Sequence, residues 1–372
     1  MMALTTFSAD SRFDLPSWVG QRQATFRFAL IDGVTNQPLR DLHPLKGTTP
    51  ILAHDTSRTI PRSLRMQLGA SDTATLDPIN NRVLVYMVTG TTQWPLGRYM
   101  FIDSSKQRYS SGRLGSLSLV DEMYIVDQAM ETGFSALVTT STSISGFGET
   151  VVALETVDQT ARRLLAPLSI DFLIEGTPFS SIGSWPVGAS RAQILKNLAT
   201  DGDYFNPWLD NNGVLQMQRT FNPDREVPDF DFDRDNKVIA GSIVETDNLL
   251  QAANRVVVVS NGVASDENTT GPIVGIFDVA SSAPHSLLNR GFTIADVREM
   301  QVESVIQATT IARNIAINST AFEFVDLSTP PDPRHDGYNV VRWDNRLWLE
   351  TAWSMELSQG GEMRHSLQRI YV

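Results

Sequence analysis

The stretch Tyr338-Asn-Val-Val-Arg-Trp343 decides the fold class, together with the runs at 347–356 and 363–372 that follow it. These runs are rich in Val, Leu and Trp, which favour strands. Turn-forming residues separate them, with Pro330-Pro331-Asp332-Pro333 ahead of the first run and Gly360-Gly361 ahead of the last. The C-terminal region therefore predicts a small β-barrel.

The N-terminal region repeats this pattern. Apolar and other residues alternate at 25–31, 64–68 and 117–119, as expected of strands with one buried face. Two more apolar runs, 82–88 and 96–102, complete the set. Five short strands separated by turn signals predict a second small antiparallel barrel or sandwich.

Between these blocks the hydrophobic period changes from two to 3.6. The Ser/Thr/Gly-rich stretch at 139–148 is typical of a linker. Thr156 with Gln159, and Ser190 with Gln193, fit capping boxes that begin two helices. Apolar positions at 301–317 predict a third helix.

Short strands accompany these helices at 170–174, 214–218, 237–244 and 255–260. The predicted fold class is mainly β with an α+β middle, in which two small β-barrel-like domains flank an α+β region. The predicted domains are an N-terminal β-barrel-like domain (residues 1–150), the α+β middle region (residues 151–290), and a helix plus a C-terminal β-barrel-like domain (residues 291–372).

Composition excludes several classes of protein. The 372 residues are 41% hydrophobic and 19% charged, which is typical of folded proteins. The chain has no cysteine, so disulfides and thiolate chemistry are excluded. No apolar run is long enough to span a bilayer, and the first 24 residues lack the pattern of a secretory signal. The net charge of −12 disfavours binding to DNA or anionic lipid.

A search for catalytic or metal-binding motifs finds none. The histidines are His43, His54, His285, His335 and His365, and no two are close enough in sequence for a helical ligand pair. A metal site would need ligands from distant segments, and we expect each histidine to be a lone surface or loop residue. Neither a nucleophile elbow nor a phosphate-binding loop is present, and 146–148 lacks the third glycine of a dinucleotide loop.

One acidic cluster, Asp229-Phe-Asp-Phe-Asp-Arg-Asp235, is similar in part to a calcium loop. Asn236 stands where the loop needs glycine, and Ser242 stands where it needs a bidentate glutamate. Alternating Asp and Phe instead predict an extended segment with a packed aromatic face and an acidic face in water. A weak cation site is the alternative.

Three tryptophans near the C-terminus, Trp343, Trp348 and Trp353, are candidates for a sugar-binding platform. Their spacing of five does not place them on one face of a strand, because residues on one face differ by an even number. Packing in the core or at an interface is the preferred interpretation. We therefore predict no catalytic, cofactor-binding or metal-binding residues, and no cofactor.

Two stretches carry a resemblance to a known family. The first contains Ser190-Arg-Ala-Gln-Ile-Leu-Lys-Asn-Leu-Ala199, Asp203-Tyr-Phe205, Asp210-Asn-Asn-Gly-Val-Leu-Gln216 and Asn254-Arg-Val-Val-Val-Val259. In this order they resemble the middle of the bacteriophage tail-hub family, also called baseplate hub, tail-tip or minor tail proteins. There a helix precedes a turn of Asp-x-x-Gly type and then a strand that begins Asn-x-Val.

The second stretch contains Pro331-Asp-Pro-Arg334, Tyr338–Trp343 and Gly360-Gly-Glu-Met363. It is similar to the closing barrel of those hubs. The N-terminal part agrees more loosely, through Leu64-Arg-Met-Gln-Leu68, Asp77-Pro78, Asn81-Arg-Val83 and Pro95-Leu-Gly-Arg-Tyr99.

The resemblance implies a structural virion protein, not an enzyme. Such hubs form a trimeric ring that adapts the sixfold tail tube to a threefold tip, with a lumen for the tape-measure protein and DNA. The implied partners are a homotrimer, the tail tube or distal tail protein, the tape-measure protein, and tip, fibre or receptor-binding proteins. DNA passes through without tight binding. The implied location is the virion tail tip, after assembly in the host cytoplasm.

Two alternatives from other classes stay open. One is a carbohydrate-binding tail or cell-surface module that uses the C-terminal tryptophans. The other is an acid/base hydrolase built from scattered Asp and Glu, which sequence alone does not identify.

Overall fold

The computed structural model describes residues 24–109, 112–144, 147–181, 183–235, 237–239, 241–247, 251–260, 272–300, 302, 304–319 and 322–371. Residues 1–23, where the sequence predicts no secretory signal, lie outside these ranges, as do Gln301 and Glu303 of the third predicted helix. No described helix has the length and apolar character that crossing a membrane requires.

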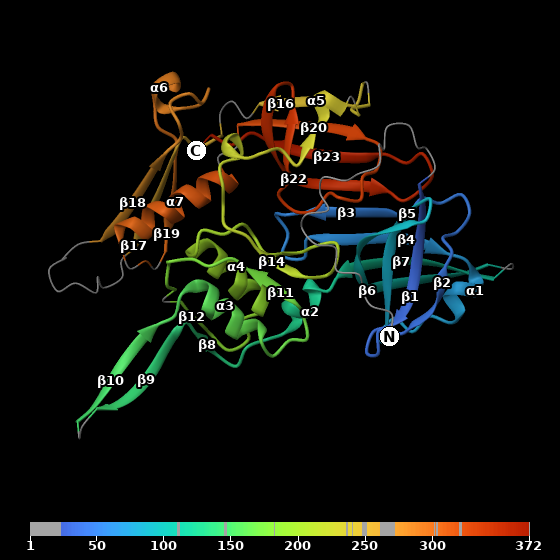
Figure 1. Cartoon of the computed structure of the whole chain (residues 1–372), viewed down its shortest axis with the longest axis horizontal. Helices are drawn as coiled ribbons and strands as arrows, with labels where there is room; N and C mark the ends of the chain where they lie inside the picture. The colour runs from blue at the N-terminus through green and yellow to red at the C-terminus, as the bar shows by residue number, and fades with distance from the viewer. Residues whose placement is uncertain are drawn as a thin grey trace.

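Strands from both ends of the chain form one sheet of 13 strands. The N-terminal strands are β1 (Thr25–Asp32), β2 (Pro38–Leu42), β3 (Ile51–Asp55), β4 (Arg62–Leu68), β5 (Asn81–Thr89), β6 (Thr92–Tyr109) and β7 (Gly112–Asp121). The others are β15 (Phe230–Asp231), β16 (Val244–Asp247), β20 (Glu323–Thr329), β21 (Val340–Trp343), β22 (Arg346–Glu356) and β23 (Met363–Gln368). Figure 1 shows the blue and red strands side by side.

The order of the sheet is β16-β20-β23-β22-β3-β4-β7-β6-β5-β1-β2, and β21 joins β22 and β15 beside this path. The link between the two ends of the chain is the antiparallel pair β22–β3, where Trp353 lies opposite His54. No closed barrel forms among the described strands, because the path ends at β16 and at β2. The two expected barrels are thus replaced by a single continuous sheet.

The largest core cluster belongs to both ends of the chain. It contains N-terminal side chains such as Leu52, Leu64 and Tyr99, and also Trp353 and Met355 from β22. Leu52, Leu64 and Tyr99 each have 0% exposure. The N-terminal and C-terminal blocks therefore share one hydrophobic interior, and burial of apolar surface holds them together.

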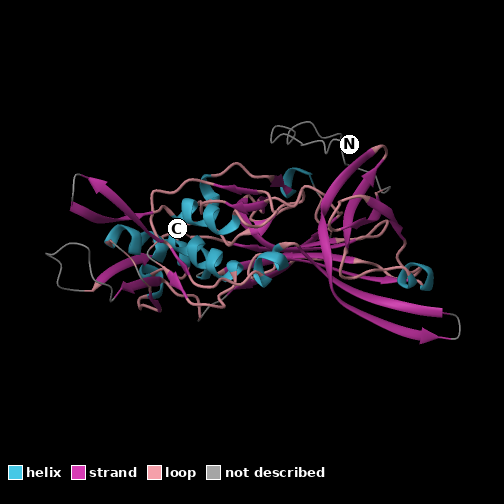
Figure 2. Cartoon of the chain, turned by 90° about the horizontal axis from the view of Figure 1, so that it is seen from below, coloured by secondary structure: helices cyan, strands magenta, loops and turns pink. Residues whose placement is uncertain are grey.

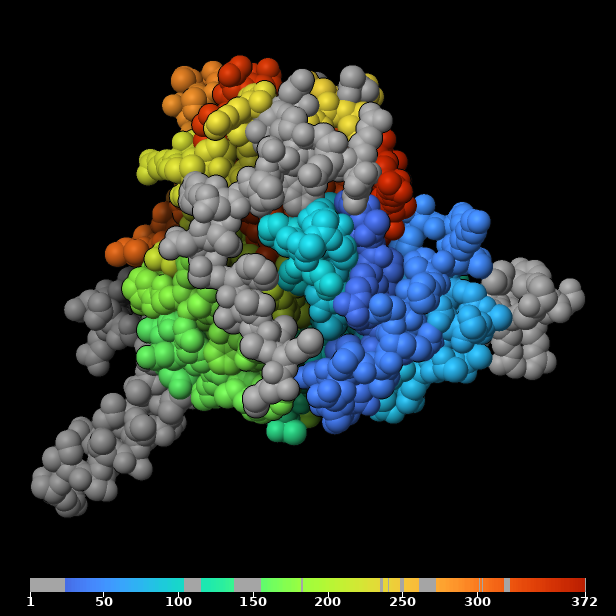
Figure 3. Space-filling view, turned by 45° about the vertical axis from the view of Figure 1, so that its right-hand side comes forward, coloured from blue at the N-terminus to red at the C-terminus, as the bar shows by residue number. Residues whose placement is uncertain are grey.

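The middle region packs two helices on a small sheet. Its elements are α3 (Val157–Leu165), α4 (Arg191–Asp201), β11 (Phe172–Ile174), β13 (Trp208–Leu209) and β14 (Leu215–Met217). β11 pairs parallel with β14, which pairs antiparallel with β13. Figure 3 shows this green region against the blue N-terminal strands.

A third helix covers a separate sheet. α7 (Val305–Ser319) packs on β18 (Ile273–Asp278) and β17 (Arg255–Ser260), and β19 (Ala295–Glu299) pairs parallel with β17. Gly275 of β18 allows this close approach, since a Cβ there would lie 2.2 Å from the backbone carbon of Ala308.

The remaining elements are short or project outward. They are α1 (Ala70–Ala74), α2 (Met123–Gln128), β8 (Phe134–Ser135), β9 (Leu137–Ile144), β10 (Phe147–Leu154), β12 (Ser184–Trp185), the 3₁₀ turn η2 (Pro223–Arg225), α5 (Phe232–Asp235) and α6 (Leu287–Arg290). The β9–β10 hairpin extends away from the body in Figure 1. Most helices lie on the side that carries the C-terminus in Figure 2.

Several sequence predictions are confirmed. The fold is mainly β with helices between strands, and α3 and α4 begin after Thr156 and Ser190 as the capping boxes predicted. The predicted linker at 139–148 was wrong, because its described residues lie in β9 and β10. Thr, Ile and Phe within this stretch favour strands, and the pairing of β9 with β10 decides the outcome.

Candidate functional site

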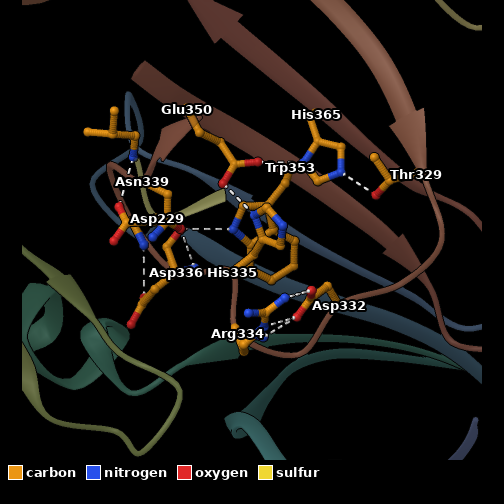
Figure 4. A network of polar contacts seen from close by, with 12 residues as sticks. Asp229, Thr329, Asp332, Arg334, His335, Asp336, Asn339, Glu350, Trp353 and His365 are labelled. Carbon is orange, nitrogen blue, oxygen red and sulfur yellow. Dashed lines mark hydrogen bonds and ion pairs between the residues drawn. The ribbon is translucent and has the colours of Figure 1, made fainter. Parts of the chain in front are cut away.

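The loop at 330–339, which connects β20 to β21, forms a buried polar junction between distant parts of the chain. Its turn residues are the Pro-rich stretch that the sequence singled out. One side of the loop contacts the N-terminal and middle regions, and the other side contacts β22 and β23. Figure 4 shows the contacts with β22 and β23.

On the first side, the buried guanidinium of Arg62 joins three segments. It donates at 2.6 Å to the Oδ1 of Asn211 and at 2.6 Å to the Oδ1 of Asp336. It also lies over the ring of Trp353, 5.7 Å from the centroid. Asn211 in turn donates its Nδ2 to the carbonyl of His335 at 3.1 Å. A planar fork of five N–H donors is well suited to such a junction.

On the second side, Glu350 lies between two histidines. His335 Nδ1 is 2.8 Å from Glu350 Oε2, and His365 Nδ1 is 2.5 Å from Glu350 Oε1. All three side chains are 0–1% exposed. The ring of His335 stacks on Phe230 with centroids 3.7 Å apart, and His365 Nε2 lies 2.8 Å from Thr329 Oγ1.

The electrostatics of this cluster favour a charged carboxylate. Burial alone would raise the pKa of Glu350, but His335 and His365 outweigh it and lower that pKa to about 2. Burial lowers the pKa of the His365 imidazole, against the attraction of Glu350. Glu350 is therefore an ionised hydrogen-bond acceptor at neutral pH.

An open groove of about 740 Å³ lies beside the cluster. His54, Trp353 and His365 line one part of it, and Ser242 and Arg364 line another. Burial and the neighbouring Arg62 hold the pKa of His54 well below its usual value, so His54 is neutral there. The groove thus borders the two histidine-bearing strands β3 and β23.

The structure corrects the expectation for most histidines. Only the side chain of His43 is strongly exposed, at 82%. His285 and His335 lie in loops but are buried, while His54 and His365 are buried in strands. His335 and His365 are not lone residues, because they share Glu350.

The sequence analysis missed this cluster because each member lies 15 residues from the next along the chain. The Gly360-Gly361 hairpin was a usable signal. It folds β23 back on β22, so that residue 365 returns to the neighbourhood of residue 350.

The acidic cluster has a structural role. Phe230 and Phe232 are buried at 7% and 4% exposure, as predicted. The extended prediction was wrong beyond Asp231, because Phe232–Asp235 forms the short helix α5. The carboxylate of Asp233 accepts backbone N–H groups from the turn at 344–345, which ties this segment to the hairpin of β21 and β22.

The tryptophans do not form a joint platform. Trp348 and Trp353 are each 3% exposed and belong to different core clusters, which supports the packing interpretation. Trp343 is half-buried and lies 5.9 Å from Trp348.

Comparison with solved structures places this architecture among tail proteins. The chain is similar to the tail protein from Neisseria meningitidis MC58, with a TM-score of 0.61, 13% identity, and coverage of 93% of this chain and 98% of that one. It is also similar to the 43 kDa tail protein of prophage MuSo2 from Shewanella oneidensis, with a TM-score of 0.58, 12% identity, and coverage of 92% of this chain and 98% of that one. The prophage tail protein gp18 from Listeria monocytogenes EGD-e gives a TM-score of 0.53 and 9% identity, with coverage of 91% of this chain and 94% of that one.

No protein-family model matches the sequence, and no curated protein matches it. The chain nevertheless has the fold of bacteriophage tail proteins over nearly its whole length. The resemblance to a tail and baseplate family that the sequence carried is confirmed at the level of fold.

Proposed function

We propose that this chain is a structural hub protein of a bacteriophage tail tip or baseplate. The observation that carries the proposal is the likeness to tail proteins, which extends over 93% of this chain and 98% of the Neisseria protein. A shared module would match only part of each chain. Agreement from end to end supports a shared architectural role.

The proposed assembly is a homotrimeric ring with a lumen for the tape-measure protein and DNA. It adapts the sixfold tube to a threefold tip, and its neighbours are the tail tube or distal tail protein and the tip, fibre or receptor-binding proteins. Assembly takes place in the host cytoplasm, and the chain is not an enzyme. The three-part division at residues 150 and 290 remains part of this proposal.

The internal contacts of the chain suit a ring subunit that must transmit force along the tail. β22 and β3 connect the two terminal blocks through backbone hydrogen bonds, and one core cluster contains side chains from both. The junction at loop 330–339 adds polar contacts to the middle region. A subunit connected in this way moves as one body under axial load.

The mass of the assembled protein tests the oligomeric state. Three copies of 41.1 kDa predict a particle of about 123 kDa by light scattering coupled to gel filtration. The same experiment with the tail tube protein of the same phage covers the case in which the ring forms only on its tube. Stable dimers or tetramers under both conditions would contradict the proposal.

The place in the particle needs a second measurement. Electron cryo-microscopy of the intact tail should show threefold density for this chain directly below the tube. Density on a side fibre would instead support the glycan-binding alternative, which has less support because Trp348 and Trp353 are buried.

A further inference from the structure

We propose that His335, Glu350 and His365 form a binding site for one divalent transition-metal ion, Zn²⁺ in the first instance. One ligand atom from each residue lies within 4.8 Å of the other two. Two imidazole nitrogens and a carboxylate are a donor set that Zn²⁺ prefers. The proposal does not depend on the role in a phage tail.

The hydrogen bonds around His365 suit a ring that binds an ion through Nδ1. The hydroxyl of Thr329 can donate to the carbonyl of Pro330 at 3.0 Å. Its oxygen then accepts from His365 Nε2 across the 2.8 Å contact, which is one of the two tautomer-dependent arrangements of that contact. In this tautomer, the lone pair of His365 Nδ1 faces the carboxylate.

A bare lone pair cannot face an ionised carboxylate at 2.5 Å without a cation between them. The cation is either a proton on Nδ1 or a metal ion. A metal ion keeps the imidazole neutral, satisfies both oxygens of Glu350, and leaves the Nε2 hydrogen for Thr329. This is the outer-shell arrangement commonly seen behind metal-binding histidines.

His335 presents the second imidazole to the same carboxylate. Its Nδ1 faces Glu350, and its ring is held in place by stacking on Phe230. Its Nε2 makes no hydrogen bond to a described residue, so Nδ1 is the nitrogen that this ring offers to an ion shared with Glu350.

The site is of the closed, structural type. With both carboxylate oxygens bound, the three residues offer four donor atoms, which is the usual number for structural zinc. Donor atoms of different residues at about 2 Å from Zn²⁺ lie roughly 3.3 Å apart, so binding moves each ring nitrogen away from the carboxylate oxygen that it now contacts by less than about 1 Å. Asp332, another acid that acts on His365, is paired with Arg334 at 2.8 Å and leaves the ion to Glu350.

The ion would cross-link β22, β23 and the loop at 330–339. Because that loop also holds Arg62 and Asn211 through Asp336 and backbone carbonyls, the metal would stabilise the whole junction. Removal of the ion would then lower the free energy of unfolding of the chain.

Metal analysis of untagged protein tests the proposal directly. The wild-type chain is incubated with Zn²⁺, separated from excess ion by gel filtration and measured by elemental mass spectrometry, with Co²⁺ absorption as a second readout. We expect one ion per chain and the visible spectrum of tetrahedral Co²⁺. Wild-type protein that retains no metal after this treatment would overturn the proposal and identify the cation as a proton.

Variants separate the site from other histidines. Glu350→Gln keeps the shape of the side chain, and its amide can still donate to one imidazole and accept from the other, so the fold is retained without the charge. Affinity for Zn²⁺ should fall by more than about 100-fold in this variant. It should fall by about 10- to 100-fold in Thr329→Val, which removes only the hydroxyl that contacts Nε2 of the ligand His365. His54→Gln is the matched control of a buried histidine and should bind like wild type. Equal binding by wild type and Glu350→Gln, with an unchanged circular dichroism spectrum, would also reject the site.

Discussion

At the scale of single residues, buried carboxyl groups that lack some hydrogen-bond partners make the stability of the fold depend on pH. Asp121 is 2% exposed, and its Oδ2 has no hydrogen-bond partner among the described residues. Burial raises the pKa of this carboxyl to about 7, although Arg62 opposes the shift. Its pKa is therefore higher in the folded than in the unfolded chain, where it is near 3.8.

A raised pKa in the folded state means that the folded chain holds the proton more tightly. The stability from Asp121 is complete below the unfolded pKa and is lost as the pH rises towards about 7. We predict that the wild-type free energy of unfolding falls by about 2–3 kcal/mol from this source between pH 5 and 8. Urea unfolding of Asp121→Asn should show a flatter pH profile over that window, and parallel profiles would contradict the assignment.

The ion pair of Arg62 and Asp336 offers a second prediction. Arg62→Met leaves Asp336 without its partner, and breaking a buried pair typically costs 3–5 kcal/mol. The expected loss is about 3 kcal/mol, at the lower end of that range, since the Asp336 side chain keeps 26% exposure.

Adding Asp336→Asn to Arg62→Met should recover a large part of this loss, because the remaining amide still accepts from Trp208. Chemical denaturation of both single variants and the double variant gives the coupling free energy. Additive losses would show that the pair is not coupled.

Residue-scale features of the site were the least predictable from sequence. His335, Glu350 and His365 carry no local motif, and their meeting depends on a strand register and a loop conformation. By contrast, alternation with Asp predicted that Phe230 and Phe232 are buried, although Phe232 lies in α5 and only Phe230 lies in a strand.

At the scale of elements, hydrophobic period and capping residues located the helices α3 and α4 and strands such as β17. Ser190 accepts a hydrogen bond from the backbone of Gln193 at 3.1 Å, as its capping box predicted. The predicted strand at 255–260 coincides with β17. The prediction at 237–244 was wrong in extent, since β16 covers Val244–Asp247, where pairing with β20 decides the boundary.

The contact between α7 and β18 gives an element-scale prediction. Gly275→Ala would place a Cβ 2.2 Å from the backbone carbon of Ala308, and neither backbone can retreat without opening the layer. The expected loss of stability is about 3 kcal/mol or more, at or above the upper end for overpacked cores.

Gly176→Ala is the matched control, because a Cβ there meets nothing within 4 Å. It should change stability by less than about 0.5 kcal/mol. Thermal or urea unfolding of both variants makes the comparison, and similar losses would contradict the proposed close packing.

At the scale of the whole molecule, the net charge predicts whether the chain binds nucleic acid. Its 42 acidic residues exceed its 30 basic ones, and non-specific DNA binding needs basic groups gathered on one surface. We predict no retention of duplex DNA in a mobility-shift titration, even at low salt. Tight, salt-sensitive retention would reveal a basic groove and reject a passive conduit.

The sequence could not predict that strands from the N-terminal and C-terminal blocks pair in one sheet, and the reason is physical. Each block shows its own strands, but which edge strands meet depends on complementarity between side chains about 300 residues apart, such as His54 and Trp353. Two separate barrels and one continuous sheet have the same local pattern.

This long-range pairing has a consequence for synthesis of the chain on the ribosome. β3 is translated roughly 300 residues before β22, its neighbour in the sheet. At about 5–20 residues per second, the nascent N-terminal strands wait roughly 15–60 s with that edge unpaired. The shared core then closes only after translation has passed Glu356, so docking of β22 on β3 is a late step in the folding of this subunit.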